Sequence, residues 1–192
     1  MKIVIIDYGA GNIQSIKFAI KRLGFEAMLS DNVVEIQNAD KVIFPGVGEA
    51  SSAMNKLRAS GLDKIVPLLK QPVLGICLGM QLMCNHTEEG NANGLGIFDV
   101  NVIKFSNTVK IPQIGWNRLT ALQSRLFEGL VEDYIYMVHS FYAPLCNETI
   151  ATCNYDVAYS AALQKSNFYG TQFHPEKSGK YGEQILKNFL KE

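Results

Sequence analysis

The sequence predicts an α/β fold in which a central, mostly parallel β-sheet is covered by helices and extended by antiparallel strands. The first half of the chain alternates short apolar runs with amphipathic stretches, as parallel strands joined by crossover helices do. After about residue 94 the chain changes to strand-like runs. With 192 residues, 47% of them hydrophobic, we expect one domain over residues 1–192.

The expected elements follow the chain in order. Three short, β-branched runs are expected to be buried strands: 2–6, 41–44 and 72–76. Helices are expected from Ile13 to Leu23, ended by Gly24, and from near Ser51 and near Leu62. The second half contributes strand-like runs at 96–105, 115–122, 134–143, 149–155, 160–164 and 168–173, and a last helix at 182–190.

Charge and cysteine usage exclude several classes of function. Lys plus Arg and Asp plus Glu each number 18, so no net charge favours nucleic acid or an anionic membrane. No apolar run approaches the roughly 18 residues of a membrane span, and residues 1–9 are too quickly polar for a signal peptide. The four cysteines form no C-x-x-C pair, so we expect free thiols. We therefore expect a cytoplasmic protein without a metal or cofactor.

Cys77 is the candidate nucleophile. It is the centre of Gly75-Ile76-Cys77-Leu78-Gly79, a G-x-C-x-G motif where a predicted strand meets a predicted helix. Such a turn strains its central residue and crowds the neighbouring backbone, which glycine relieves. The helix N-terminus would favour the thiolate. The alternative is a buried cysteine in a tight strand–helix contact, as we expect for Cys84, which has no flanking glycines.

His174 is the candidate base, and Glu176 is the candidate carboxylate that orients it. A thiol nucleophile needs a base, and His174 directly follows a strand-like run. Pro175 disfavours helix at His174, so His174 and Glu176 are expected to continue an extended path with their side chains on one side. A carboxylate beside an imidazole holds its tautomer and stabilises the cation. A surface H-P-E turn is the alternative, and His86 is expected in a solvated loop.

The stretch F-P-G-V-G-E-A, residues 44–50, is the candidate oxyanion loop. It follows a predicted strand at the same edge of the sheet, and its glycines allow the backbone N–H groups of Gly46 and Val47 to turn toward the cysteine. The N–H of Leu78 is the expected second donor. The alternative is an ordinary glycine-rich strand–helix turn.

Two further features concern ligands. Gln81 lies four positions after Cys77, so one helical turn brings its amide to the same face, where it could bond a polar substrate. The glycine-rich turn at residues 7–12 resembles a dinucleotide-binding motif, but Gln14 stands where the third glycine is required. NAD binding is therefore rejected.

Together, G-I-C-L-G-M-Q, P-G-V-G and H-P-E-K-S-G resemble the motifs of class I (triad) glutamine amidotransferases, over nearly the whole chain. The resemblance implies a flavodoxin-like fold. It implies that Cys77 attacks the side-chain amide of glutamine, that His174 shuttles the proton and that Glu176 orients His174. A γ-glutamyl thioester would form, ammonia would leave, and water would release glutamate. The resemblance assigns glutamine binding to Gln81, His139, Ser140 and Phe141.

Within that family, the stretches 6–12, 112–117 and 136–141 resemble the glutaminase subunits of imidazole glycerol phosphate synthases, in histidine biosynthesis. The resemblance implies a heterodimer with a (β/α)8-barrel cyclase subunit, which uses the ammonia to make imidazole glycerol phosphate and AICAR. It places six residues at the partner interface: Asn12, Gln113, Trp116, Asn117, Tyr136 and Lys177.

The chain departs from the family pattern at one place. That pattern usually has histidine and methionine where this chain has Gln113 and Ile114, a position expected to face the partner. Two alternatives stay open: a paralogous glutaminase that supplies ammonia to a surface-sugar amidation enzyme, and a chaperone-like or non-catalytic member of the fold superfamily. The H-P-E motif near the C-terminus argues against the second. A core position is the alternative for Trp116.

Overall fold

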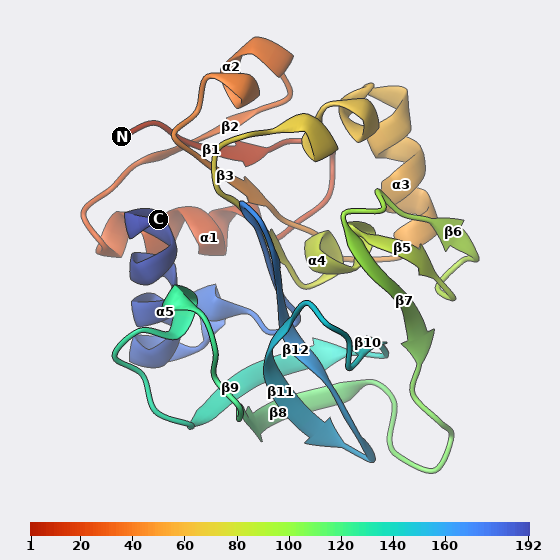
Figure 1. The fold of residues 1–192 in the computed structure, drawn as a ribbon. Coiled ribbons are helices and arrows are strands. Elements are labelled where there is room, and N and C mark those ends of the chain that lie inside the picture. Colours follow the sequence, from red (N-terminus) through yellow and green to blue (C-terminus); the bar gives the residue numbers. More distant parts are fainter.

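The computed structural model describes residues 1–192 and confirms the predicted α/β architecture (Figure 1). The parallel part of the sheet has the strand order β2-β1-β3-β4-β13. These strands are β1 (Ile3–Ile6), β2 (Ala27–Ser30), β3 (Lys41–Phe44), β4 (Val73–Ile76) and β13 (Phe168–Thr171). All residues of β1, β3 and β4 are buried, which explains why these runs are apolar without alternation.

Two apolar cores lie on opposite faces of this sheet. Ile3 and Ile5 of β1 pack in one core with α1 (Ile13–Arg22) and α5 (Gly179–Lys191). The other core joins Val4 and Ile6 to α2 (Val33–Gln37) and α3 (Ala50–Ala59). Successive side chains of a strand point to opposite faces, so β1 contributes to both cores. Figure 1 shows α1 beside α5 and α3 on the other side of the sheet.

The antiparallel extension begins where β13 pairs with β12 (Val157–Lys165). It continues through β10 (Phe141–Pro144), β7 (Phe98–Lys104), β5 (Cys84–Thr87) and β6 (Ala92–Asn93), while β11 (Thr149–Tyr155) pairs with β12. Strands β8 (Gln113–Arg118) and β9 (Tyr134–His139) form a separate antiparallel pair. The change of texture after residue 94 is thus confirmed as a change to strands. No helix here has the length and apolarity that crossing a bilayer requires.

The structure differs from the sequence-based expectations in several elements. The helix expected near Leu62 is replaced by two 3-10 turns, Leu62–Lys64 and Val66–Leu68, because Pro67 has no N–H to continue an α-helix. No signal in the sequence predicted β2 or α2. Strand β2 lies at the sheet edge with half of its residues exposed, and α2 has only five residues.

Two smaller corrections concern histidine segments. His86 lies in strand β5 rather than in a loop, and its Nε2 is 3.0 Å from Oδ1 of Asn91. Cys84, at the start of the same strand, is fully buried as expected. Residues Pro175–Lys177 form a 3-10 turn instead of an extended path, since φ of proline suits the first turn of a helix.

Candidate active site

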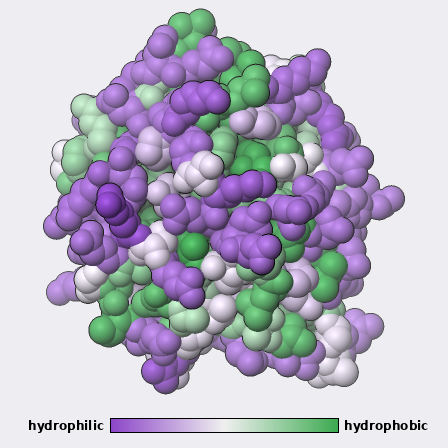
Figure 2. Space-filling model, viewed as in Figure 1, coloured by the Kyte–Doolittle hydropathy of each residue, from purple (hydrophilic) through white to green (hydrophobic).

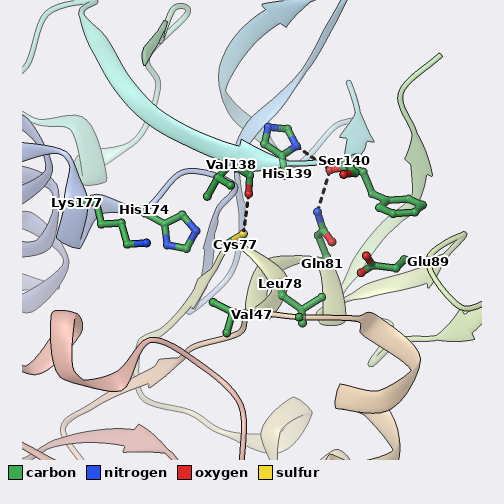
Figure 3. Close-up of a pocket in the computed structure, with 12 residues that line it drawn as sticks. Val47, Cys77, Leu78, Gln81, Glu89, Val138, His139, Ser140, His174 and Lys177 are labelled. Atoms are coloured by element: carbon green, nitrogen blue, oxygen red, sulfur yellow. Dashed lines mark hydrogen bonds between the residues drawn. The ribbon is translucent and has the colours of Figure 1, made fainter. Parts of the chain in front are cut away.

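A pocket of about 240 Å³ opens at the carboxyl ends of the parallel strands, with Cys77 at its centre (Figure 3). Its lining consists of Val47, Gly48, Cys77, Leu78, Gln81, Glu89, Val138, His139, Ser140, Phe141, His174 and Lys177. Among the residues predicted for the oxyanion and the substrate, only Gly46 is absent from this lining. All four cysteines are unpaired, and Cys77 alone reaches the pocket.

Cys77 occupies the strained turn that its glycines predicted. Strand β4 ends at Ile76, helix α4 (Leu78–Leu82) begins directly afterwards, and Cys77 between them has φ +53°. Positive φ is uncommon for a residue with a side chain and marks strain at functional turns. A Cβ atom at Gly79 would lie 2.0 Å from the carbonyl oxygen of Phe44, and one at Gly75 would lie 2.6 Å from the sulfur of Met83. Only glycine therefore fits on either side of the thiol.

His174 and Glu176 form a buried pair beside this thiol. Nδ1 of His174 is 2.8 Å from Oε1 of Glu176, so the predicted contact is present although the backbone path differs. Burial lowers the pKa of His174, but hydrogen bonds to Cys77 and Glu176 and the charges of both groups outweigh it and raise that pKa from 6.5 to about 10. The imidazolium form of His174 is thus favoured at this position.

Gln81 has its amide nitrogen bonded within the protein. Its Nε2 donates to the carbonyl of Phe141 and to Oε1 of Gln172, each at 2.9 Å. Gln81 lines the pocket, so its oxygen, which accepts but does not donate, is the atom left for a ligand. The sequence predicted that Gln81 faces the substrate. The hydrogen-bond partners of its nitrogen could be identified only from the tertiary structure.

Glu89 is a pocket residue that sequence reasoning missed. In Figure 3 it lies on the opposite side of Cys77 from His174. Its Oε2 accepts the backbone N–H of Ala50 at 3.0 Å. Burial raises the pKa of Glu89, and the neighbouring Glu49 adds to the effect while the bond from Ala50 opposes it. Glu89 stands in a polar run with no motif of its own, so nothing in its spacing singled it out.

His139 lines the pocket, but its ring serves the protein interior. Nδ1 is 2.8 Å from the carbonyl oxygen of Phe141 and Nε2 is 3.2 Å from the hydroxyl of Tyr159. Figure 3 shows the ring pointing away from Cys77. Burial lowers the pKa of His139 to about 4, so the ring is neutral. Both ring nitrogens thus face protein atoms, so the backbone of the stretch 139–141 is what the pocket presents at His139.

The glycine-rich loop after β3 is held against the turn at Cys77. A Cβ atom at Gly46 would lie 2.5 Å from the backbone nitrogen of Gly79, so the loop touches the start of α4. The hydroxyl of Tyr8 donates to the carbonyl of Pro45 at 2.8 Å and fixes the loop from the side of β1. Val47 and Leu78, two of the predicted oxyanion donors, both line the pocket beside Cys77 (Figure 3).

Two of the six residues predicted for a partner interface, Trp116 and Tyr136, lie on the outer face of the β8–β9 pair, with Lys177 beside Tyr136. Trp116 is 54% exposed, which rules out the core position as its alternative. Its ring centroid is 6.1 Å from that of Tyr136, and Nζ of Lys177 is 5.9 Å from the Tyr136 centroid. Asn12 and Asn117 are both half-buried.

Gln113 is the most deeply buried of the predicted interface residues. It is 1% exposed, and its Oε1 accepts from the hydroxyl of Tyr159 at 3.0 Å. Because side chains alternate along a strand, Ile114 and Trp116 face outward while Gln113 faces inward. The prediction that the Gln113 side chain meets a partner is therefore wrong, and the outward residue is Ile114, at 62% exposure.

Comparisons with known proteins agree with this geometry. Residues 4–192 match the family Glutamine amidotransferase class-I. The chain is 55% identical to Imidazole glycerol phosphate synthase subunit HisH of Bacteroides thetaiotaomicron and 53% identical to that of Bacteroides fragilis, over 99% of each chain. A solved structure described as glutamine amidotransferase shares the fold, with a TM-score of 0.77 and 18% identity over 98% of this chain and 97% of that one.

Proposed function

The chain belongs to the class I glutamine amidotransferase family, and from this premise we propose that it hydrolyses glutamine and delivers the ammonia to an imidazole glycerol phosphate synthase. The observation that carries the proposal is the buried His174–Glu176 pair beside the strained Cys77 turn. Residues 1–192 act as one glutamine amidotransferase domain, located in the cytoplasm. The names of the HisH relatives favour histidine biosynthesis over sugar amidation.

The first half of the reaction forms a thioester. The Cys77 thiolate attacks the side-chain amide carbon of glutamine, and the carbonyl electrons move to the oxygen, which faces the backbone N–H groups of Val47 and Leu78. Gly46, which has no side chain, keeps the loop that carries Val47 in contact with α4, which carries Leu78. The His174 imidazolium gives its proton to the amide nitrogen, the C–N bond breaks, and ammonia leaves with a γ-glutamyl thioester left on Cys77. Glu176 holds His174 by Nδ1 throughout.

The second half releases glutamate. Water attacks the thioester carbon while the neutral His174 takes its proton, and the C–S bond breaks to return the thiolate and the imidazolium. The product is the γ-carboxylic acid, which ionises in water. One glutamine and one water thus give glutamate and ammonia, and the two side chains end in the states in which they began.

The pocket supplies acceptors for the α-ammonium of glutamine. Oε1 of Gln81 and the carboxylate of Glu89 lie on the side of Cys77 away from His174 (Figure 3). Both accept hydrogen bonds, and the carboxylate adds opposite charge. The side-chain amide of glutamine is thereby directed to the thiol. Ser140, between β9 and β10, and Phe141, at the start of β10, contact the substrate, and His139 acts through its backbone.

The partner is a (β/α)8-barrel cyclase subunit that contacts the outer face of β8 and β9. Trp116, Tyr136 and Lys177 lie together there, and we assign Asn12 and Asn117 to the same interface. An aromatic side chain that is exposed in the free chain is a typical anchor of a protein interface.

The experiment reconstitutes the chain with its barrel subunit and compares two nitrogen sources. Cys77→Ser should lower glutamine-dependent synthesis by about 10³-fold or more, because without its nucleophile a triad enzyme keeps only the rate that oxyanion stabilisation and binding supply. Synthesis from added ammonia should stay intact. Cys146→Ser is the matched control and should keep both activities. Full glutamine-dependent activity in Cys77→Ser, or loss of ammonia-dependent synthesis, would contradict the proposal.

A further inference from the structure

We propose that Gln172 is a further catalytic residue, whose side-chain amide donates a hydrogen bond to the Cys77 thiolate. The inference rests on the glutaminase reaction proposed above. Gln172 follows β13, two positions before His174, and is 0% exposed. Its Nε2 is 3.7 Å from Sγ of Cys77. It is absent from the pocket lining, so it contacts the reacting sulfur from the protein interior without reaching the substrate.

The orientation of the Gln172 amide follows from its neighbours. The carbonyl of Phe141 only accepts, so Gln81 must present its NH₂ group to it, at 2.9 Å. The second hydrogen of that NH₂ group then points to Gln172, at 2.9 Å, which must present its oxygen. The nitrogen of Gln172 is therefore the atom that faces Cys77. Turning either amide over would bring two donors or two acceptors together.

The amide complements the other groups around the sulfur. The carbonyl oxygen of Val138 is 3.8 Å from Sγ and accepts, so it favours the protonated thiol. The N–H of Gln172 favours the thiolate, because a donor stabilises the charged form of an acceptor. The thiolate exists before the attack on glutamine and again when the thioester is hydrolysed. One donor thus assists both halves of the reaction.

Several titratable groups lie around the pocket that contains this sulfur. His174 and Lys177 line the pocket from the turn after β13, with Glu176 behind His174, and Glu89 faces it from beyond β5. Tyr8 lies near from the side of β1; its pKa is raised by burial and, in smaller part, by the charge of Cys77. A substitution at Gln172 leaves all five groups in place, so a changed titration of Cys77 would report the loss of the Gln172 amide.

The test measures the rate of Cys77 alkylation by iodoacetamide against pH in the full chain, with the modified residue identified by mass spectrometry. Gln172→Met removes the donor at similar volume. The midpoint of the alkylation rate against pH, which belongs to the coupled Cys77–His174 pair, should rise by about one pH unit. At pH values below the wild-type midpoint, alkylation should be about tenfold slower. Gln123→Met, the same change at an exposed position, is the matched control and should leave the profile in place.

A second measurement needs no variant that has to fold. In the wild-type chain labelled with ¹⁵N-glutamine, the side-chain amide protons of Gln172 should shift across the same pH range as Cys77 alkylation. The inference would be overturned if the amide proton shifts of Gln172 did not change with pH. It would also be overturned if the alkylation rate of Gln172→Met followed the same pH dependence as that of the wild type. Neither measurement includes free glutamine as a substrate or the partner subunit. A failure of the proposed glutaminase function would therefore be seen separately, as a wild-type complex without glutamine-dependent synthesis.

Discussion

The two histidines near the pocket have opposite protonation properties although they lie in one buried region. The pKa of His139 is lowered to about 4 by burial, while hydrogen bonds and charges of Cys77 and Glu176 overcome burial at His174 and raise its pKa to about 10. Environments that separate the pKa values of two like groups assign them different roles. His139 is a neutral structural group, and His174 is the group that carries the proton.

His139 should make the protein sensitive to acid. Its pKa of about 4 in the folded state lies below 6.5, so below pH 6.5 the unfolded chain binds a proton that the native state refuses. The free energy of unfolding should therefore fall between pH 6.5 and pH 4, by about 3 kcal/mol from this residue. His139→Gln has no such titration, so its urea unfolding free energy should fall less between pH 7 and pH 4. Parallel pH dependences of variant and wild type would refute this.

At the scale of elements, the oxyanion loop, strand β3 and helix α4 form one tightly packed unit. The absence of a side chain at Gly46 and at Gly79 lets the loop after β3 and the first turn of α4 meet with backbone contacts. The strained Cys77 conformation is maintained by these neighbours, since strain of about 1–3 kcal/mol persists only where the surroundings determine it.

Gly79→Ala tests this packing, because two effects predict opposite signs. Helix propensity favours alanine over glycine by about 1 kcal/mol. The added Cβ would lie 2.0 Å from the backbone oxygen of Phe44, which cannot move without shifting β3 or the loop. We expect the clash to win, with unfolding free energy lowered by about 2 kcal/mol in urea titrations.

Gly24→Ala is the control for this prediction. It adds the same methyl group in open space at φ +85°, so only backbone strain of about 1 kcal/mol opposes it. A Gly79→Ala protein more stable than the wild type would show that the close contact at Gly79 does not limit the turn.

The sequence predicted the elements whose signals are local. Continuous apolar runs identified β1, β3 and β4, and the glycine spacing identified the turn at Cys77, because burial and backbone crowding act on adjacent residues. Contacts between distant segments gave no such signal. Gln113 is polar, yet it is buried, with its Oε1 bonded to the hydroxyl of Tyr159. Gln172 and Glu89 became visible only when folding placed them beside Cys77 and the pocket.

At the scale of the whole molecule, the β8–β9 pair connects the outer surface with the pocket. Ile114, which faces outward, pairs in register with Val138, whose carbonyl lies 3.8 Å from the Cys77 sulfur. The surface in Figure 2 is largely hydrophilic, with hydrophobic residues in separate patches, several of them over the antiparallel strands in the lower part of the view. A partner that covers Ile114 and Trp116 would therefore contact a strand pair that lines the active site.

Trp116 should contribute to partner binding and little to folding. Its ring is 54% exposed in the free chain, so Trp116→Ala removes few buried contacts and should change the melting temperature by no more than about 2 °C. If the ring anchors the interface, the same change should cost about 2 kcal/mol of binding, a Kd about 30-fold higher by calorimetric titration with the barrel subunit. Leu68→Ala is the matched control, since Leu68 is 65% exposed in the 3-10 turn that precedes β4, at the amino end of the parallel strands. It should leave the Kd unchanged. An unchanged Kd in Trp116→Ala would mean that the partner docks on another face, and a collapsed melting temperature would mean that the ring supports the fold after all.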